Sequence, residues 1–379
     1  MGQSFSYWEQ KSFLLGFDVI IIGSGIVGLS SALKLKAKHP ALQIGVLESG
    51  FLPSGASTKN AGFACFGSVS EAVDEIKYEG EENFLSLVEM RWKGLSRLRK
   101  NLGDKSIRFK QFGGYEIFKR SEKVFAIECM EEIQHLNRLL KPIIGKHDIY
   151  AEANAKIADF GFSGIEYLIE NKYEGQIDSG RMMTALISKV AGMGVQIFNS
   201  CRVHQFEGEA GNHIIKTSQG NFKSKLLIVA TNAFAHELLP ELEIIPGRGQ
   251  VLVTEPIKNL SVRGAFHYNR GYTYFRNIEN RILLGGFRNL DKDAEQTTEP
   301  GITDVIQTAL EELLHENILF GTKPKIEHRW SGVMGFGPEL KPIVREVRPG
   351  VYCAARCSGM GVAIGSLLGE QVAQLVMPD

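Results

Sequence analysis

A glycine-rich turn between a short apolar run and a helical pattern constrains this chain more than any other feature. Residues 18–22 (DVIII) are almost entirely β-branched, which predicts a strand buried on both faces of a parallel sheet. The sequence GSGIVG follows at 23–28, and a helical pattern runs from there until Pro40, a residue that ends helices. A second apolar run at 43–48 completes a strand–helix–strand unit.

The spacing of the glycines predicts a dinucleotide site. In the G-x-G-x-x-G pattern, Gly23 permits a tight turn, Gly25 lets the backbone approach a pyrophosphate, and Gly28 lets the helix pack closely on the strand. The start of the helix offers free N–H groups to phosphate. Glu48 follows about twenty residues later, where a carboxylate accepts hydrogen bonds from ribose hydroxyls. A carboxylate there repels a 2′-phosphate, so NAD or FAD is expected rather than NADP.

Further segments resemble one family of flavoproteins, the D-amino-acid, glycine and sarcosine oxidases. Residues 56–62 (ASTKNAG) look like the A-S-x-x-N-A-G segment of that family, and residues 226–233 (LLIVATNA) resemble its strand and turn near FAD. The resemblance runs from about residue 17 to 375 and also covers the C-terminal signature and the substrate-domain strands, here at 330–338, 358–361, 246–250, 274–276 and 281–286.

The resemblance implies non-covalently bound FAD. Family members with covalent flavin carry a cysteine near the tryptophan-containing strand, where this chain has Gly332. Cys353 and Cys357 are then the residual candidates for attachment, and a buried free thiol is the expectation for each. The residues expected to contact FAD are Gly23, Ser24, Gly25, Ile26, Val27, Gly28, Glu48, Ser49, Ser57, Thr58, Lys59, Asn60, Ala61, Gly62, Val203, Ala230, Thr231, Asn232, Trp330, Ser358, Gly359, Met360, Gly361 and Val362.

The order of the patterns predicts an α/β (α+β) two-domain fold, in which a mixed sheet-and-helix substrate domain is inserted into a Rossmann-like FAD-binding domain. A chain of 379 residues exceeds one ordinary α/β core. Helical periodicity covers 81–141 and 301–320, and strand patterns cover 249–254, 271–276 and 281–285. The expected FAD-binding domain comprises residues 1–85, 172–245 and 325–379, and the substrate domain comprises 86–171 and 246–324.

The same resemblance implies oxidation of the CH–NH bond of an amino acid or secondary amine, with hydride transfer to flavin N5 and hydrolysis of the resulting imine. A carboxylate on the substrate needs an arginine, whose planar fork binds it in a bidentate manner. Tyr272, Tyr274 and Arg276 share one face of a period-two strand and are predicted to form an aromatic wall with a cationic end. Arg248 is the second candidate, with bracing of the domain junction as its alternative role.

Two departures from the family limit this transfer. Met334 stands where glycine and D-amino-acid oxidases carry a carboxylate-binding arginine, and Arg356 stands where a glycine is usual before the S-G-x-G turn. Phe63 and Cys65 are expected near the isoalloxazine. His267 is a weaker site candidate, because a lone histidine is more often structural.

Composition excludes other classes of function. Lysine plus arginine and aspartate plus glutamate both number 43, so no net charge favours nucleic acid or an anionic membrane. Residues 17–35 are apolar but are interrupted by glycines, serines and Asp18, which argues against a membrane segment. The five scattered cysteines lack metal-ligand or redox spacing, so no metal and reduced thiols in a cytoplasmic protein are expected.

The expected partners are a small amine or amino acid and an electron acceptor, either O2 or a quinone or carrier protein. Two alternatives stay open at this point. One is a non-catalytic flavin-binding protein, and the other is an NAD-dependent dehydrogenase.

Overall fold

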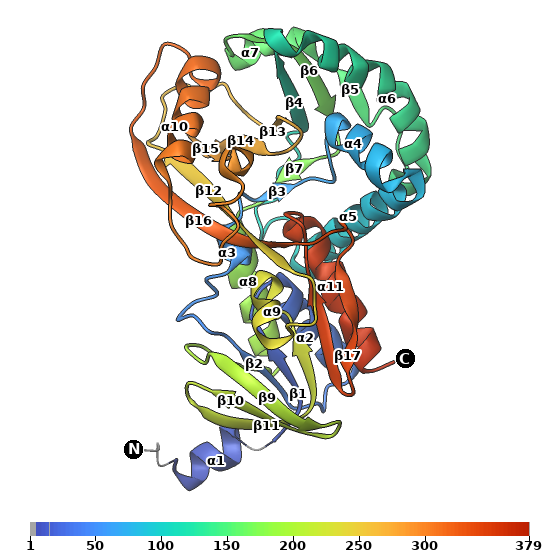
Figure 1. The fold of residues 1–379 in the computed structure, drawn as a ribbon, viewed down its shortest axis with the longest axis vertical. Coiled ribbons are helices and arrows are strands. Elements are labelled where there is room, and N and C mark those ends of the chain that lie inside the picture. The colour runs from blue at the N-terminus through green and yellow to red at the C-terminus, as the bar shows by residue number, and fades with distance from the viewer. Residues whose placement is uncertain (1–4, 15, 379) are drawn as a thin grey trace.

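Two eight-stranded sheets form the framework of the protein (Figure 1). The structure is a computed structural model that describes residues 5–14 and 16–378. The first sheet has the strand order β17 (Ile343–Arg348), β18 (Val351–Ala355), β11 (Gly220–Val229), β1 (Phe17–Ile22), β2 (Ile44–Leu47), β8 (Gln196–Phe198). Two further strands extend it: β10 (Asn212–Thr217) pairs with β11, and β9 (Val203–Glu209) pairs with β10.

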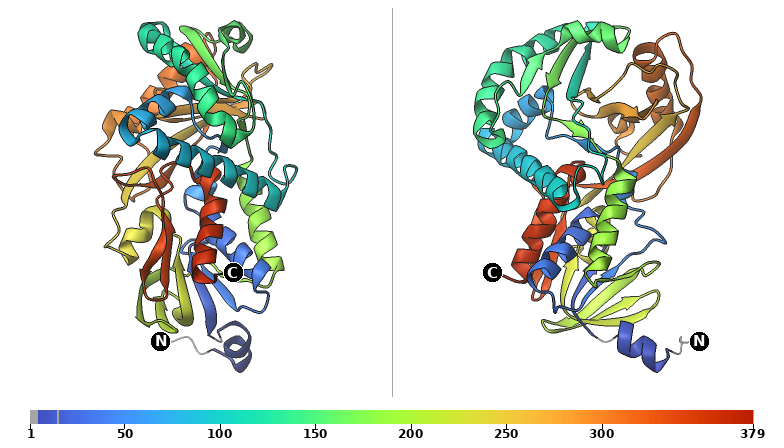
Figure 2. Two further views of the ribbon diagram at one scale, coloured as in Figure 1. Left: turned by 90° about the vertical axis from the view of Figure 1, so that its right-hand side faces the viewer. Right: turned by 180° about the vertical axis from the view of Figure 1, so that it is seen from behind.

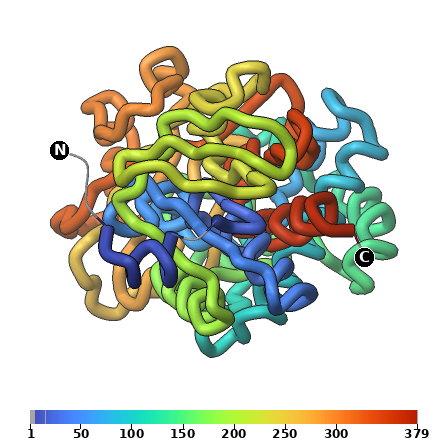
Figure 3. Tube along the Cα trace, turned by 90° about the horizontal axis from the view of Figure 1, so that it is seen from below, coloured from blue at the N-terminus to red at the C-terminus, as the bar shows by residue number. Residues whose placement is uncertain are grey.

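Strand β1 lies in the middle of this sheet and is parallel to both of its neighbours, β11 and β2. Val19 and Ile21 pack on one face with helices α2 (Ile26–Lys38), α8 (Ser179–Gly192) and α11 (Gly361–Val376). Ile20 and Ile22 pack on the other face, beneath β9, β10 and α9 (Ala235–Leu238). Burial on both sides explains the uninterrupted apolar run of β1. Seen from below, β9–β11 cover the underside, with α1 (Tyr7–Phe13) beside them (Figure 3).

The second sheet contains the inserted strands and is mixed, because β4 pairs with β13 in parallel and the other neighbours are antiparallel. Helix α10 (Asp304–Leu313) packs on one face. Helix α6 (Lys123–Ile144) covers the other face of β4 and β6. The order is β16 (Ile326–Phe336), β12 (Ile245–Thr254), β15 (Arg281–Gly286), β14 (Thr273–Ile278), β13 (Ala265–Tyr268), β4 (Gly114–Lys119), β6 (Ile165–Asn171), β5 (Tyr150–Glu152).

Short elements and one long helix join the two sheets. Strands β3 (Phe63–Ala64) and β7 (Gly175–Gln176) pair between them. Helix α5 (Glu81–Leu102) contributes Leu98 to the core of the first sheet and Phe84 to the core under α6. Figure 2 shows α5 crossing beside α11. The remaining helices are α3 (Ala56–Lys59), α4 (Val69–Glu79) and α7 (Ile157–Phe160).

The predicted two-domain α/β architecture is confirmed, although some boundaries differ. Strand β16 belongs to the second sheet, whereas the expected boundary at 325 assigned it to the FAD-binding domain. Strand β4 interrupts the stretch 81–141, because its alternating residues pair with β13 and β6. The helix expected over 301–320 begins at Asp304 and ends in a π-helical turn. Within the described residues, no helix is both long enough and apolar enough to cross a bilayer.

Candidate active site

A cavity of about 870 Å³ opens between the loops of the first sheet and the strands of the second. This volume is within the range of small-molecule and cofactor sites. Its lining includes Gly23 and Glu48 from the first sheet and Tyr274 and Arg288 from the second. The predicted dinucleotide residues and the predicted substrate-domain strands therefore meet at a single site.

Two glycines of the turn after β1 are required by their surroundings. A Cβ on Gly28 would lie 2.0 Å from the carbonyl oxygen of Gly23. Gly23 itself has φ +106°, and its Cβ would lie 2.8 Å from the carbonyl oxygen of Ala230. Any side chain at either position would push α2 away from the sheet or fill the turn, which is the reason for this glycine spacing.

The carboxylate of Glu48 is fixed at the end of β2. Its Oε2 accepts hydrogen bonds from the Ser24 hydroxyl at 2.6 Å and the Ser24 amide at 3.2 Å. Its Oε1 accepts one from the Gly50 amide at 2.9 Å. The group is buried and lines the cavity, so it is held where a ribose hydroxyl can donate to it.

The segment 56–62 is held by side chains from distant parts of the chain. The Ser57 hydroxyl accepts from the Ile26 amide at 3.0 Å, which ties the segment to the start of α2. Asn60 Oδ1 accepts from the Gly62 amide at 2.8 Å and from the Ser179 hydroxyl at 2.7 Å. These bonds shape the loop into one wall of the cavity.

Two buried hydroxyl groups on the cavity wall lack partners. Among the described residues, neither Thr231 Oγ1 nor Ser358 Oγ has a hydrogen-bond partner, although both residues line the cavity. Gly361 and Val362, at the start of α11, line it as well, and the first amides of a helix have no partner within the helix. Buried polar groups are normally satisfied, so this wall fits a polar ligand.

Most residues expected to contact FAD line this cavity. The exceptions act from behind its wall. Ser24 donates to Glu48, Gly28 packs on Gly23, the Thr58 hydroxyl donates to Pro53 and Gly55, and the Trp330 indole donates to the Lys59 carbonyl at 2.9 Å.

Arg356, which replaces the glycine usual before the S-G-x-G turn, does not project into the cavity. Its backbone has φ +64°, the conformation for which glycine is usual. Its guanidinium donates to the Lys341 carbonyl at 2.7 and 3.0 Å and does not line the cavity. Asn232 Oδ1 accepts from the amides of Arg356 and Cys357 at 3.1 and 3.2 Å, which holds the turn.

Comparison with known proteins decides the family. The FAD dependent oxidoreductase (DAO) family matches residues 18–375. This chain belongs to that family. It is 26% identical to the probable oxidoreductase OrdL of Haemophilus influenzae, over 96% of this chain and 83% of that protein. It is 24% identical to the glycine oxidase of Geobacillus kaustophilus, over 95% and 93% of the two chains.

A solved structure shares the fold of this FAD-dependent oxidoreductase. The L-proline dehydrogenase of P. horikoshii superposes with a TM-score of 0.77 at 20% identity, covering 96% of this chain and 94% of that chain. FAD is the cofactor of the family, so the prediction of FAD is confirmed and the alternative of an NAD-dependent dehydrogenase is set aside. The site fits FAD, since the glycine turn, Glu48 and the unpartnered hydroxyls offer phosphate, ribose and polar contacts.

The structure does not bring Arg276 into the cavity of this oxidoreductase. Its guanidinium is buried and donates to the backbone carbonyls of Ala61 and, at 2.9 Å, Ile177. Burial lowers its pKa to about 10. Arg276 shares a strand face with Tyr274 as expected, but its guanidinium donates to one carbonyl of the segment 56–62, that of Ala61, and to the Ile177 carbonyl before α8. Arg276 therefore ties the segment 56–62 to residue 177 and does not line the cavity.

Arg248 does not brace the domain junction, which was its alternative role, because its partners all lie within the inserted domain. Its Nε and Nη2 donate to both oxygens of buried Glu295 at 3.0 and 2.8 Å. This bidentate pair fixes the segment after β15 to β12 and lies outside the cavity wall.

The two tyrosines do line the cavity. The Tyr274 ring meets the Phe63 ring edge-on with centroids 5.5 Å apart, and burial raises the pKa of its phenol to about 12. Tyr272 lies just before β14 and is 39% exposed. Both tyrosines therefore line the cavity, without the cationic end that Arg276 was expected to provide.

Arg288 is the cationic residue that sequence reasoning missed. It is the second residue after β15. The residue between them, Phe287, has a φ of +58°, which turns the chain. Its guanidinium lies over the rings of Phe336 and Tyr272, at 4.1 and 5.4 Å from their centroids. Burial lowers its pKa. Within the described residues no carboxylate pairs with it, and it lines the cavity beside Met334. Its only sequence signal was a basic residue directly after a predicted strand.

Proposed function

We propose that this FAD-dependent oxidoreductase oxidises the carbon–nitrogen bond of an amino acid or secondary amine that carries a carboxylate, and that Arg288 binds the carboxylate. The observation that carries the proposal is the half-buried, unpaired guanidinium of Arg288 on the cavity wall. An arginine without a protein partner in a partly desolvated site favours an anionic ligand, and its planar fork matches a carboxylate.

The surrounding side chains support a small substrate with an apolar or compact body. Tyr272, Tyr274 and Phe336 are aromatic neighbours of Arg288. The Tyr274 phenol stays neutral at physiological pH, because its pKa is raised to about 12 by burial, so it is available as a hydrogen-bond donor. FAD, when bound, supplies the hydride-accepting chemistry, and these side chains orient the substrate and exclude water.

Two similar proteins are named for amino-acid substrates, glycine and L-proline, both of which are amino acids with a carboxylate. This is consistent with the role given to Arg288. Either O2 or a quinone or carrier protein accepts the electrons in this proposal.

The test is an anaerobic titration of the flavin-loaded protein with amino acids and with the matching decarboxylated amines. Bleaching of the flavin absorbance by a carboxylate-bearing amine is expected. Arg288→Gln should raise the concentration needed for half-reduction by about 100-fold, since two charge-assisted hydrogen bonds are lost. Decarboxylated analogues should be unaffected.

Arg281→Gln is the matched control, because Arg281 lies on β15 but bonds Glu327 and the Thr254 carbonyl and does not line the cavity. Equal effects of Arg288→Gln on acids and on decarboxylated amines would contradict the assignment. A yellow protein that no amine bleaches would support the alternative of a non-catalytic flavin-binding protein. Admission of air after bleaching separates an oxidase from a dehydrogenase by the rate at which the colour returns.

A further inference from the structure

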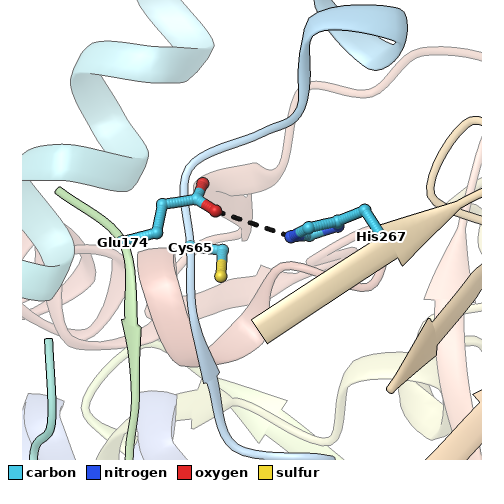
Figure 4. Close-up of side chains that lie close together, drawn as sticks. All are labelled: Cys65, Glu174 and His267. Carbon is cyan, nitrogen blue, oxygen red and sulfur yellow. Dashed lines mark ion pairs between the residues drawn. The ribbon is translucent and has the colours of Figure 1, made fainter. Parts of the chain in front are cut away.

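Three side chains from distant parts of the chain converge at the junction of the two domains. Cys65 directly follows β3, Glu174 directly precedes β7, and His267 lies in β13 of the second sheet. Because β3 and β7 are antiparallel with Ala64 opposite Gly175, Cys65 and Glu174 are the next cross-strand neighbours. Figure 4 shows the Glu174 carboxylate directed at the His267 ring, with Cys65 on the segment that runs between the strands carrying these two residues.

The ligand atoms are close and are shielded from solvent. Cys65 Sγ, a Glu174 oxygen and a His267 ring nitrogen all lie within 4.8 Å of one another. The three residues are 2%, 1% and 8% exposed. Thiolate, imidazole and carboxylate together are a donor set that Zn²⁺ takes in proteins.

The geometry between His267 and Glu174 is poor for a hydrogen bond and suitable for a shared ion. His267 Nε2 lies 3.5 Å from Glu174 Oε2, beyond the usual N–H···O range. Among the described residues Nε2 has no hydrogen-bond partner, although it is buried. Two ligands of a tetrahedral Zn²⁺, with bonds of about 2.1 Å, are separated by about 3.4 Å. The observed separation matches that requirement.

The surroundings hold the ligands in place. Glu174 Oε1 accepts from the amides of Phe66 and Gly67 at 2.7 and 3.0 Å, which leaves Oε2 directed at His267. Glu71 Oε2 lies 3.7 Å from His267 Nδ1, on the side of the ring away from Glu174. At this distance Glu71 contributes a nearby negative charge rather than a hydrogen bond to the second ring nitrogen.

We propose that Cys65, Glu174 and His267 form a Zn²⁺ site with an open coordination position. Cys65 and His267 line the cavity, whereas Glu174 lies behind its wall, so an ion held by the three residues exposes its remaining position to the cavity. The His267 ring meets the Phe63 ring with centroids 5.4 Å apart, which places the ion beside the aromatic wall. This inference does not depend on the proposed substrate.

Zinc binding by the chelator-treated, flavin-loaded protein tests the proposal. Equilibrium dialysis against Zn²⁺ should give one bound ion per chain. Co²⁺ in place of Zn²⁺ should give intense tetrahedral absorption in the red, beyond the bands of oxidised flavin. Cys65→Ser, Glu174→Gln and His267→Gln should each weaken Zn²⁺ binding at least tenfold. Glu174→Gln keeps the acceptor for Phe66 and Gly67 and removes only the ligand oxygen.

Cys201→Ser is the matched control, because Cys201 is a buried free thiol that takes no part in the cluster. It should bind Zn²⁺ as the unaltered protein does. FAD content and the melting temperature of each variant establish that it is folded. Unaltered Zn²⁺ affinity in folded Cys65→Ser, or binding without a defined stoichiometry, would overturn the proposal and leave His267 and Glu174 as a buried ion pair.

Discussion

The guanidinium carbon of Arg288 lies 4.1 Å from the centroid of the Phe336 ring. Phe336 is the last residue of β16, and Arg288 follows the end of β15, so the contact joins the ends of these two strands. A guanidinium placed over a ring face keeps its N–H edge free for a carboxylate.

Phe336→Leu should therefore weaken binding of carboxylate substrates about fivefold, because the cation–π contact is lost while the apolar volume is largely kept. Phe336→Tyr keeps the ring and should behave as the unaltered protein. The half-reduction concentration in anaerobic titration measures both. No change in Phe336→Leu would mean that the ring does not position Arg288.

Gly28→Ala should impair FAD binding and folding together. The added Cβ would lie 2.0 Å from the Gly23 carbonyl oxygen, so α2 must shift and the phosphate-binding turn opens, at a cost of about 1–3 kcal/mol or more. Gly192→Ala, at the end of α8, meets nothing within 4 Å and should be neutral or slightly stabilising. Thermal unfolding with and without added FAD measures the difference, and equal behaviour of the two variants would contradict the packing argument.

Arg276→Ala should lower FAD content and stability and should leave carboxylate recognition intact in molecules that retain FAD. The change removes donors to the buried carbonyls of Ala61 and Ile177, at about 2–5 kcal/mol for two unsatisfied groups. Arg108→Ala, at an exposed arginine, should change stability by no more than about 0.5 kcal/mol. A selective loss of carboxylate affinity in Arg276→Ala would restore the role first expected from the sequence.

FAD should be released completely by acid precipitation. Cys357 lines the cavity, but burial raises the pKa of its thiol to about 12, so almost no thiolate exists at neutral pH to attack a flavin. Cys353 is completely buried and lies outside the cavity wall. Flavin colour that stays with the precipitate, and is lost in Cys357→Ser, would show a covalent link.

Local patterns located the part of the cavity wall that comes from the first sheet. The turn at 23–28, Glu48 and the segment 56–62 have short-range spacings that reflect close backbone approaches, and most of their residues line the cavity. Their contacts with FAD stay a prediction. The S-G-x-G pattern likewise predicted that a helix begins at Gly361, where α11 starts.

The substrate half depends on contacts that no local pattern contains. The period-two alternation placed Tyr274 and Arg276 on one face of the strand. It could not reveal that the Arg276 guanidinium donates its hydrogen bonds to the carbonyls of Ala61 and Ile177. Arg288 enters the cavity through the turn at Phe287. No short-range spacing of metal ligands in the sequence pointed to Cys65, Glu174 and His267, because they are far apart in the chain. They come together only because β3 pairs with β7 next to β13.

The cavity wall draws on segments that are synthesised at very different times. Strand β18 and helix α11 lie after the whole inserted domain in the chain, yet β18 pairs with β11 and α11 packs on α2. Domains tend to fold as they emerge from the ribosome, and here the inserted sheet can form while the glycine turn still lacks its partner helix. We therefore expect FAD to bind late in the biogenesis of this enzyme, because a chain interrupted before residue 351 would lack β18 and α11 beside the glycine turn.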